Sequence, residues 1–74
     1  MSDISNIIDD YFYSADRERV YDYIINEIEK IVIMKALERS YGNQVAAARM
    51  LGVHRNTLNS KIRKFNIDIG RFKK

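Results

Sequence analysis

Residues 42–65 decide the fold, and they read GNQVAAARMLGVHRNTLNSKIRKF. Asn43 is a favourable N-cap, because its side-chain oxygen can accept a hydrogen bond from the first turn of a helix. A short helix is therefore predicted over residues 44–51. Gly52 interrupts this helix after about two turns, and a second helix is predicted over residues 55–65. The stretch thus predicts two short helices joined by a tight turn at residues 52–54.

The residues around this turn meet three requirements of a helix-turn-helix. Two helices that cross closely need a small residue at their contact, and Ala47 or Ala48 supplies it. The turn needs a residue that adopts the left-handed conformation, which Gly52 does without a steric penalty. Val53 follows directly and places an apolar group in the corner between the helices. The conjunction of these features indicates a helix-turn-helix.

The second helix of the motif has one apolar and one polar face. Leu58, Ile62 and Phe65 recur at i, i+4 and i+7 and define the buried face. Arginine can pair with guanine O6 and N7, and asparagine can pair with adenine N6 and N7. Any amphipathic surface helix has a polar face, so this face supports DNA binding only together with the turn. The residues turned outward are Arg55, Asn56, Asn59, Ser60 and Arg63, flanked by Lys61 and Lys64.

The charge of the chain is divided between its halves. Residues 1–38 hold nine acidic and four basic residues, whereas residues 39–74 hold nine basic residues and one acidic residue. A compact cationic half can displace counterions from nucleic-acid phosphates, and an acidic, apolar half is poorly suited to that role. A basic face that is merely solvated is the alternative, and charge by itself does not decide between the two.

The N-terminal half is predicted to form two helices rich in apolar residues. The first carries an apolar stripe and breaks near Ser14. The second runs over about residues 16–40 and is ended by Gly42, which can adopt the left-handed conformation that closes a helix. The stripe of the first helix consists of Ile4, Ile7, Ile8, Tyr11 and Phe12. One side of the second helix carries Val20, Tyr21, Ile24, Ile25, Ile28, Ile31, Val32 and Ala36, and the other carries Tyr23, Ile33, Met34 and Leu37.

A helix with apolar residues on both sides must be buried on both sides. We expect the C-terminal helices to cover one side and a second copy of the chain to cover the other. A chain of 74 residues without cysteine buries a modest core and has no disulfide to reinforce it. A core within one chain is the alternative, and a two-stranded coiled coil fits less well. The residues expected in the dimer interface are Ile7, Ile8, Tyr11, Phe12, Val20, Tyr21, Ile24, Ile25, Ile28, Ile31 and Val32.

No feature of the sequence indicates an enzyme. The single histidine, His54, has no cysteine partner and is expected at a helix start near the DNA backbone rather than at a metal ion. Adjacent carboxylates such as Asp9 and Asp10 point in different directions on a helix. Four of the five tyrosines lie in the acidic half, which favours packing over stacking on single-stranded nucleic acid. Without a signal peptide or an apolar run of spanning length, we expect a soluble, cytoplasmic, nucleoid-associated chain with no metal, cofactor, small-molecule ligand or membrane partner.

Residues 43–67 resemble the Fis type of helix-turn-helix, found in the nucleoid protein Fis and at the C-terminus of NtrC-like, sigma-54-dependent activators. The resemblance is carried by GNQ at 42–44, two alanines at 47–48, LGV at 51–53, RNTL at 55–58 and KI at 61–62. From Val20 onward the chain fits the family's order of a long dimerisation helix followed by two DNA-binding helices. The resemblance implies an all-α, four-helix, intertwined homodimer whose two recognition helices enter successive major grooves of a pseudo-palindromic site.

The resemblance also implies roles for individual residues. Arg55 is the expected principal base reader, with Asn56 and Asn59 beside it. Relatives commonly have Ser, Asp or Asn at position 54 as a cap, and often Arg or Lys at positions 59 and 60. We therefore expect a different preferred sequence and a shallower salt dependence of binding. The expected contacts with the DNA backbone are Asn43, Gln44, His54, Thr57, Ser60, Lys61, Arg63 and Lys64.

The chain is expected to form one structural domain with dimerisation helices at 1–42, the helix-turn-helix at 43–67 and a basic tail at 68–74. Two roles stay open for the last residues of the tail, 70–74, which either contact phosphates or fray in solvent. The predicted function is sequence-specific binding of double-stranded DNA as a homodimer in bacterial transcription regulation, within an NtrC-like activator. A free-standing Fis-like protein that bends DNA is the alternative. Rivals from other classes are a helical adaptor for an acidic protein and a shape-reading RNA binder.

Overall fold

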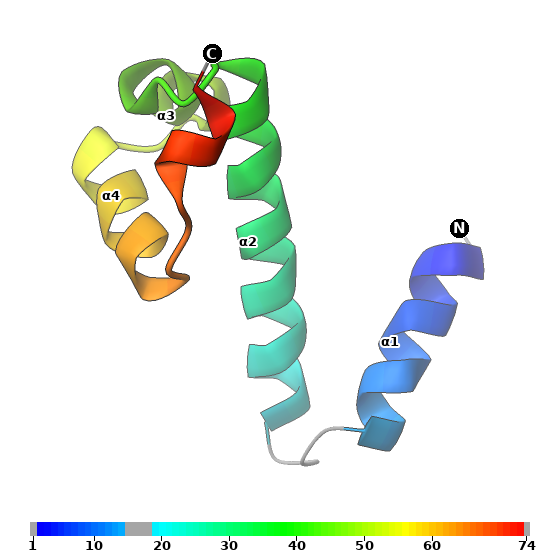
Figure 1. The fold of residues 1–74 in the computed structure, drawn as a ribbon. Coiled ribbons are helices and arrows are strands. Elements are labelled where there is room, and N and C mark those ends of the chain that lie inside the picture. Colours follow the sequence, from blue (N-terminus) through cyan, green and yellow to red (C-terminus); the bar gives the residue numbers. More distant parts are fainter. Residues whose placement is uncertain (1, 15–18, 74) are drawn as a thin grey trace.

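The computed structural model is an assembly of helices, and it describes residues 2–14 and 19–73 (Figure 1). The elements are α1 Ser2–Ser14, α2 Val20–Arg39, α3 Gln44–Leu51, α4 Arg55–Lys64 and the 3-10 helix η2 Ile69–Phe72. No strand occurs in these two ranges, and the predicted all-α class is confirmed. The helices end within one residue of the predicted positions. The predicted start of the second helix at residue 16 lies outside the described residues.

The long helix α2 organises the arrangement of the other elements. Figure 1 shows α3, α4 and η2 gathered beside the C-terminal half of α2, whereas α1 diverges from its N-terminal end. α3 packs against both α2 and α4, and α1 packs against α2. The helix-turn-helix therefore packs directly on α2, and α1 lies apart from the helix-turn-helix.

α2 ends in a turn with two successive residues in the left-handed conformation. The N–H of Gly42 donates to the carbonyl of Leu37 over 2.8 Å, and the N–H of Tyr41 donates to the carbonyl of Glu38 over 3.3 Å. This pairing is a Schellman motif, which requires a positive φ at the residue before Gly42. Tyr41 has a φ of 54° and Gly42 a φ of 82°. Gly42 is thus left-handed as predicted, but Tyr41 occupies the position that closes the helix.

The two helices of the motif end in the same way. Gly52 has a φ of 71°, and the N–H of Val53 donates to the carbonyl of Ala48 over 3.0 Å. In α4 the left-handed position belongs to Asn66, with a φ of 56°. Asparagine tolerates this conformation better than most residues, because its short polar side chain can hydrogen-bond locally. Local sequence signals therefore fix the end of each motif helix and the direction of the chain beyond it.

One apolar core joins the C-terminal half of α2 to the helix-turn-helix. Leu37 and Leu58 are fully buried, and Ala47 has no exposed surface, which lets α3 approach its neighbours closely. Ala36 belongs to this core, which corrects its predicted place on the opposite side of α2. The buried members of the core are Ile33, Ala36, Leu37, Ala47, Ala48, Leu58 and Ile62, and Leu51, Phe65, Ile67, Ile69 and Phe72 pack against them.

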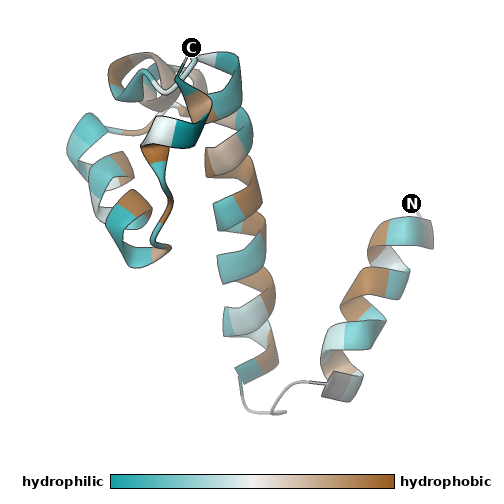
Figure 2. Cartoon of the chain, in the orientation of Figure 1, coloured by the Kyte–Doolittle hydropathy of each residue, from teal (hydrophilic) through white to brown (hydrophobic). Residues whose placement is uncertain are grey.

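The N-terminal half leaves most of its apolar side chains exposed. Ile7 is 55% exposed and Ile28 is 49% exposed, although each lies on an apolar stripe. Figure 2 shows hydrophobic residues recurring along α1 and α2, and away from the other described elements on α1. Val20 differs from the other residues predicted for the dimer interface, because it is already buried within the chain. The place of Val20 in the dimer interface stays a prediction.

Candidate nucleic-acid interface

Asn43 begins the first helix of the motif. Its Oδ1 accepts a hydrogen bond from the N–H of Ala46 over 3.1 Å, which confirms the predicted N-cap. Asn43 is exposed. The neighbouring Gln44 is half-buried. The first backbone N–H groups of a helix have no carbonyl partner within it, and they form a suitable contact for a phosphate.

His54 caps the second helix of the motif. Its Nδ1 accepts a hydrogen bond from the N–H of Asn56 over 3.1 Å, and its backbone is extended with φ −70° and ψ 145°. An accepting Nδ1 places the hydrogen of the neutral imidazole on Nε2. The structure thus gives His54 the capping role that Ser, Asp or Asn commonly fills at helix starts, and leaves Nε2–H as a donor for an anion.

α4 presents its polar residues to solvent in the way that the helical spacing predicts. Leu58 and Ile62 are buried and fix the opposite face against the core. Asn59 is only half-exposed, so it lies at the edge of the polar face rather than at its centre. The exposed residues of α4 are Arg55, Asn56, Thr57, Ser60, Arg63 and Lys64.

Lys61 and Lys64 contact α2. The Nζ of Lys61 lies 2.7 Å from Oε2 of Glu29, and the Nζ of Lys64 donates to Oδ1 of Asn26 over 3.3 Å. The Lys64 ammonium also lies 5.3 Å from the centre of the Phe65 ring. Sequence periodicity placed both lysines on the flank of the polar face, but it gave no information about acceptors on α2. A contact of Lys61 with DNA would compete with the Glu29 carboxylate.

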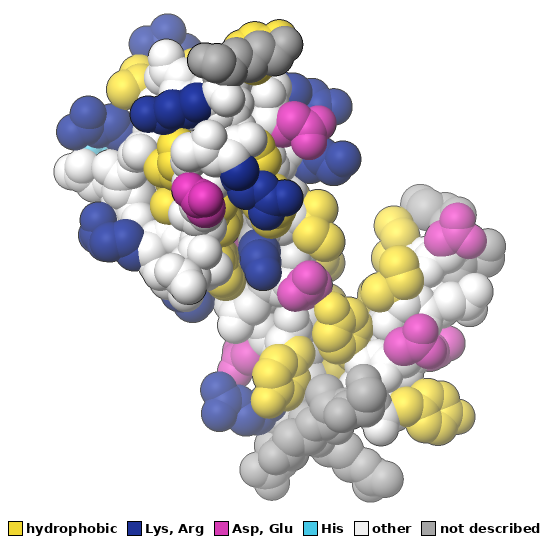
Figure 3. Space-filling view, in the orientation of Figure 1, with side chains coloured by type: hydrophobic (Ala, Val, Ile, Leu, Met, Phe, Trp, Pro, Cys, Tyr) yellow, Lys and Arg dark blue, Asp and Glu magenta, His cyan; other side chains and the backbone are white. Residues whose placement is uncertain are grey.

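The charge of the molecule is sorted in space as well as along the chain. α1 carries Asp3, Asp9 and Asp10 and no Lys or Arg. Figure 3 shows dark-blue basic side chains spread over the part of the molecule that holds α3 and α4, and magenta acidic side chains on α1. The cationic surface therefore includes the exposed face of α4, where a polyanion would be attracted.

Other kinds of site are not apparent in the described ranges 2–14 and 19–73. No three His, Asp or Glu side chains there converge on a point where they could hold a metal ion. None of the helices in those ranges has the length and apolarity needed to cross a bilayer. No buried polar side-chain atom of the described chain is left without a hydrogen-bond partner.

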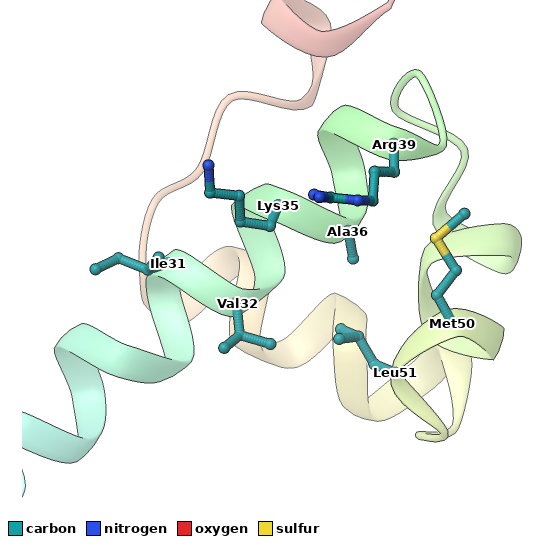
Figure 4. A pocket seen from close by; sticks show the side chains of 7 residues that line it. All are labelled: Ile31, Val32, Lys35, Ala36, Arg39, Met50 and Leu51. Atoms are coloured by element: carbon teal, nitrogen blue, oxygen red, sulfur yellow. The ribbon is translucent and has the colours of Figure 1, made fainter. Parts of the chain in front are cut away.

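An apolar pocket of about 260 Å³ lies between α2 and α3 (Figure 4). Its lining is almost entirely aliphatic, with Val32 and Leu51 at the centre and Lys35 and Arg39 at the rim. A second cleft of about 490 Å³ lies between α1 and α2, and its lining includes Ile8. Both recesses lack the convergent polar groups that orient a small ligand.

The position of the C-terminal tail was not predicted from the sequence. Ile69 and Phe72 pack against the core, and Ile69 lies beside the turn between α2 and α3. Fraying in solvent, one of the two expectations for residues 70–74, is therefore wrong for residues 70–72. The signal was the spacing of Ile67, Ile69 and Phe72, which continues the apolar pattern past the motif.

Comparison with known proteins identifies relatives of this chain. Residues 24–65 match the family model described as "Bacterial regulatory protein, Fis family". The chain is 42% identical over 52 residues to the "DNA-binding transcriptional regulator NtrC" of Azospirillum brasilense, and likewise to that of Rhizobium meliloti (strain 1021). It is 44% identical over 52 residues to the protein of that name from Bradyrhizobium sp. (strain RP501 Parasponia).

Each of these alignments covers 70% of the chain but only 11% of the relative, so the chain spans about a tenth of the length of the proteins it matches. No solved structure matches the chain significantly. The family match contains most of α2, all of α3 and α4, and both capping residues. With its Fis-type helix-turn-helix, the chain belongs to the Fis family of bacterial regulatory proteins.

Proposed function

We propose that this chain is a sequence-specific DNA-binding domain that binds double-stranded DNA as a homodimer in bacterial transcription regulation. The observation that carries the proposal is the exposed polar face of α4, held outward by Leu58 and Ile62 on a capped helix in the cationic half. Arg55 and Asn56 occupy its N-terminal end, from which the recognition helix of such motifs reads base edges. Asn43 and His54 lie at the starts of α3 and α4 and supply contacts with the DNA backbone.

The homodimer in this proposal covers the exposed apolar residues of α1 and α2. Ile7, Ile25, Ile28 and Ile31 keep between 38% and 55% of their surface exposed in one chain. A contiguous apolar surface of this kind marks an interaction site in a soluble protein. A second copy in two-fold symmetry would cover it, and would place two α4 helices on one side of the assembly.

We further propose that the domain functions at the end of an NtrC-like, sigma-54-dependent activator. The support is the identity to proteins named NtrC, of whose length the aligned segment makes up 11%. A free-standing Fis-like protein that bends DNA is the second candidate, favoured by the family match alone. The NtrC relatives favour the first candidate.

The test of DNA recognition is selection from a random duplex pool followed by binding of Arg55→Ala to the selected site. A two-fold symmetric consensus is expected, and Arg55→Ala should lower the affinity about 5- to 150-fold, equivalent to about 1–3 kcal/mol. Arg19→Ala is the matched control, because Arg19 is an exposed arginine at the opposite end of α2. Equal affinities of both variants, or preferential binding to RNA or to an acidic protein, would contradict the proposal.

A further inference from the structure

The segment after α4 is held in place by its own contacts. Oδ1 of Asp68 accepts a hydrogen bond from the N–H of Gly70 over 3.0 Å and caps η2. Ile69 and Phe72 pack against the core that supports the helix-turn-helix. The family match ends at residue 65, so this segment lies outside the matched region.

Lys73 follows η2 and lies across the turn that leads into α3. A Cβ atom placed on Gly42 would lie 2.8 Å from Cγ of Lys73 and 3.3 Å from the carbonyl oxygen of Ile69. The aliphatic stem of Lys73 therefore covers a position where only glycine fits. Gly42 is bonded to Asn43, the cap of α3, and Figure 1 shows the C-terminal end of the chain beside α3.

The ammonium of Lys73 differs from those of the lysines on α4. Lys61 is paired with Glu29 and Lys64 with Asn26, whereas Lys73 is exposed and its ammonium has no ion pair or hydrogen bond within the described chain. The Cγ of Lys73 lies against Gly42, which positions the base of the stem, while the residue as a whole stays exposed.

We infer that Lys73 contacts a phosphate of the DNA backbone next to the phosphate contacted by Asn43, and so extends the DNA-binding surface beyond the helix-turn-helix. The inference rests on the proposed DNA-binding function. Duplex DNA that lies against α4 and the start of α3 would continue past Asn43, and the stem of Lys73 lies against Gly42, the residue before Asn43. Such a contact positions the protein without reading bases, so it raises affinity for all duplex sequences alike.

The experiment compares Lys73→Gln with Arg71→Gln on the duplex obtained by selection. Arg71 is the matched control, because it lies in the same segment and carries the same charge but faces α2 beside Met34 and Glu38. Affinity is measured from about 50 to 200 mM salt. Lys73→Gln should reduce the slope of log K against log salt by about 1 per protomer, and should weaken binding equally at specific and random duplexes. Arg71→Gln should change the slope by less than half as much.

Two further measurements separate a lost phosphate contact from a loss of folding as the cause of a reduced slope. Lys73→Arg should restore the slope, and the thermal unfolding of Lys73→Gln should match that of the unaltered chain. Equal slopes for Lys73→Gln and Arg71→Gln, with normal binding by the unaltered chain, would overturn the inference and leave the proposed function intact. Failure of the unaltered chain to bind any duplex would overturn both.

Discussion

The two ends of α2 carry similar apolar residues and use them in opposite ways. At the C-terminal end, Leu37 is fully buried against α3 and α4. At the N-terminal end, Ile25 and Ile28 are 38% and 49% exposed, although α1 lies next to them. The first end forms a core that one chain completes, and the second forms a surface that one chain leaves open.

This difference shows that apolar content does not by itself specify where a core lies. The C-terminal end recruits three short elements whose small residues and left-handed turns permit close packing, whereas the N-terminal end has only α1. The charges follow the same division, with basic groups around the completed core and acidic groups on α1. One end is suited to a polyanion and the other to a protein surface.

The largest effect is expected from breaking the completed core with Leu58→Ala. Leu58 is fully buried, and removing a buried leucine side chain leaves a cavity that costs about 2–5 kcal/mol of unfolding free energy. Urea denaturation at several protein concentrations measures this loss, which should be the same at each concentration. Ile7→Ala on the open surface is the comparison, and its loss should appear only at concentrations where the chain associates. A smaller loss for Leu58→Ala than for Ile7→Ala would contradict the division between the two ends.

An intermediate effect is expected from placing a charge on the open surface with Ile28→Asp. Burial of the exposed half of Ile28 in each of two copies stabilises a dimer by about 2 kcal/mol, and a buried carboxylate adds a desolvation cost. The dimer dissociation constant should therefore rise at least about 30-fold. Light scattering at tens of micromolar should find a dimer for the unaltered chain and a monomer for Ile28→Asp.

Tyr13→Asp is the matched control for the dimer, because Tyr13 is also on the acidic half but is 91% exposed and lies opposite the stripe of α1. It should leave the dimer intact. A monomeric unaltered chain, or equal weakening by both substitutions, would rule out an interface on this surface.

The sequence predicted the features that depend on residues close together in the chain. Asn43 caps α3, Gly52 adopts the left-handed conformation, and Leu58 with Ile62 faces the core, because each outcome follows from helix geometry and local hydrogen bonding. The Fis-type motif was predictable for the same reason. The family match over residues 24–65 confirms this motif.

The features that escaped prediction depend on contacts between distant residues. The tail packs on the core because Ile69 and Phe72 find an apolar surface beside α2, and their spacing shows that they are apolar partners but not which surface they meet. Lys61 and Lys64 point toward α2 because Glu29 and Asn26 happen to lie one turn apart on the facing helix. Helical periodicity gives the direction of a side chain around the helix axis, but not the acceptor that the side chain meets.

The smallest effect is expected at the ion pair between Glu29, near the middle of α2, and Lys61 of α4. Both side chains are about a third exposed, so Glu29→Gln should lower the unfolding free energy by less than about 1 kcal/mol. The same substitution removes a carboxylate that competes with phosphate for the Lys61 ammonium. Affinity for duplex DNA at low salt should therefore increase a few-fold, whereas Glu38→Gln, an exposed substitution of equal charge elsewhere on α2, should increase it less. If the two substitutions change the affinity for duplex DNA equally, Lys61 holds α4 against α2 and is not part of the DNA-binding surface.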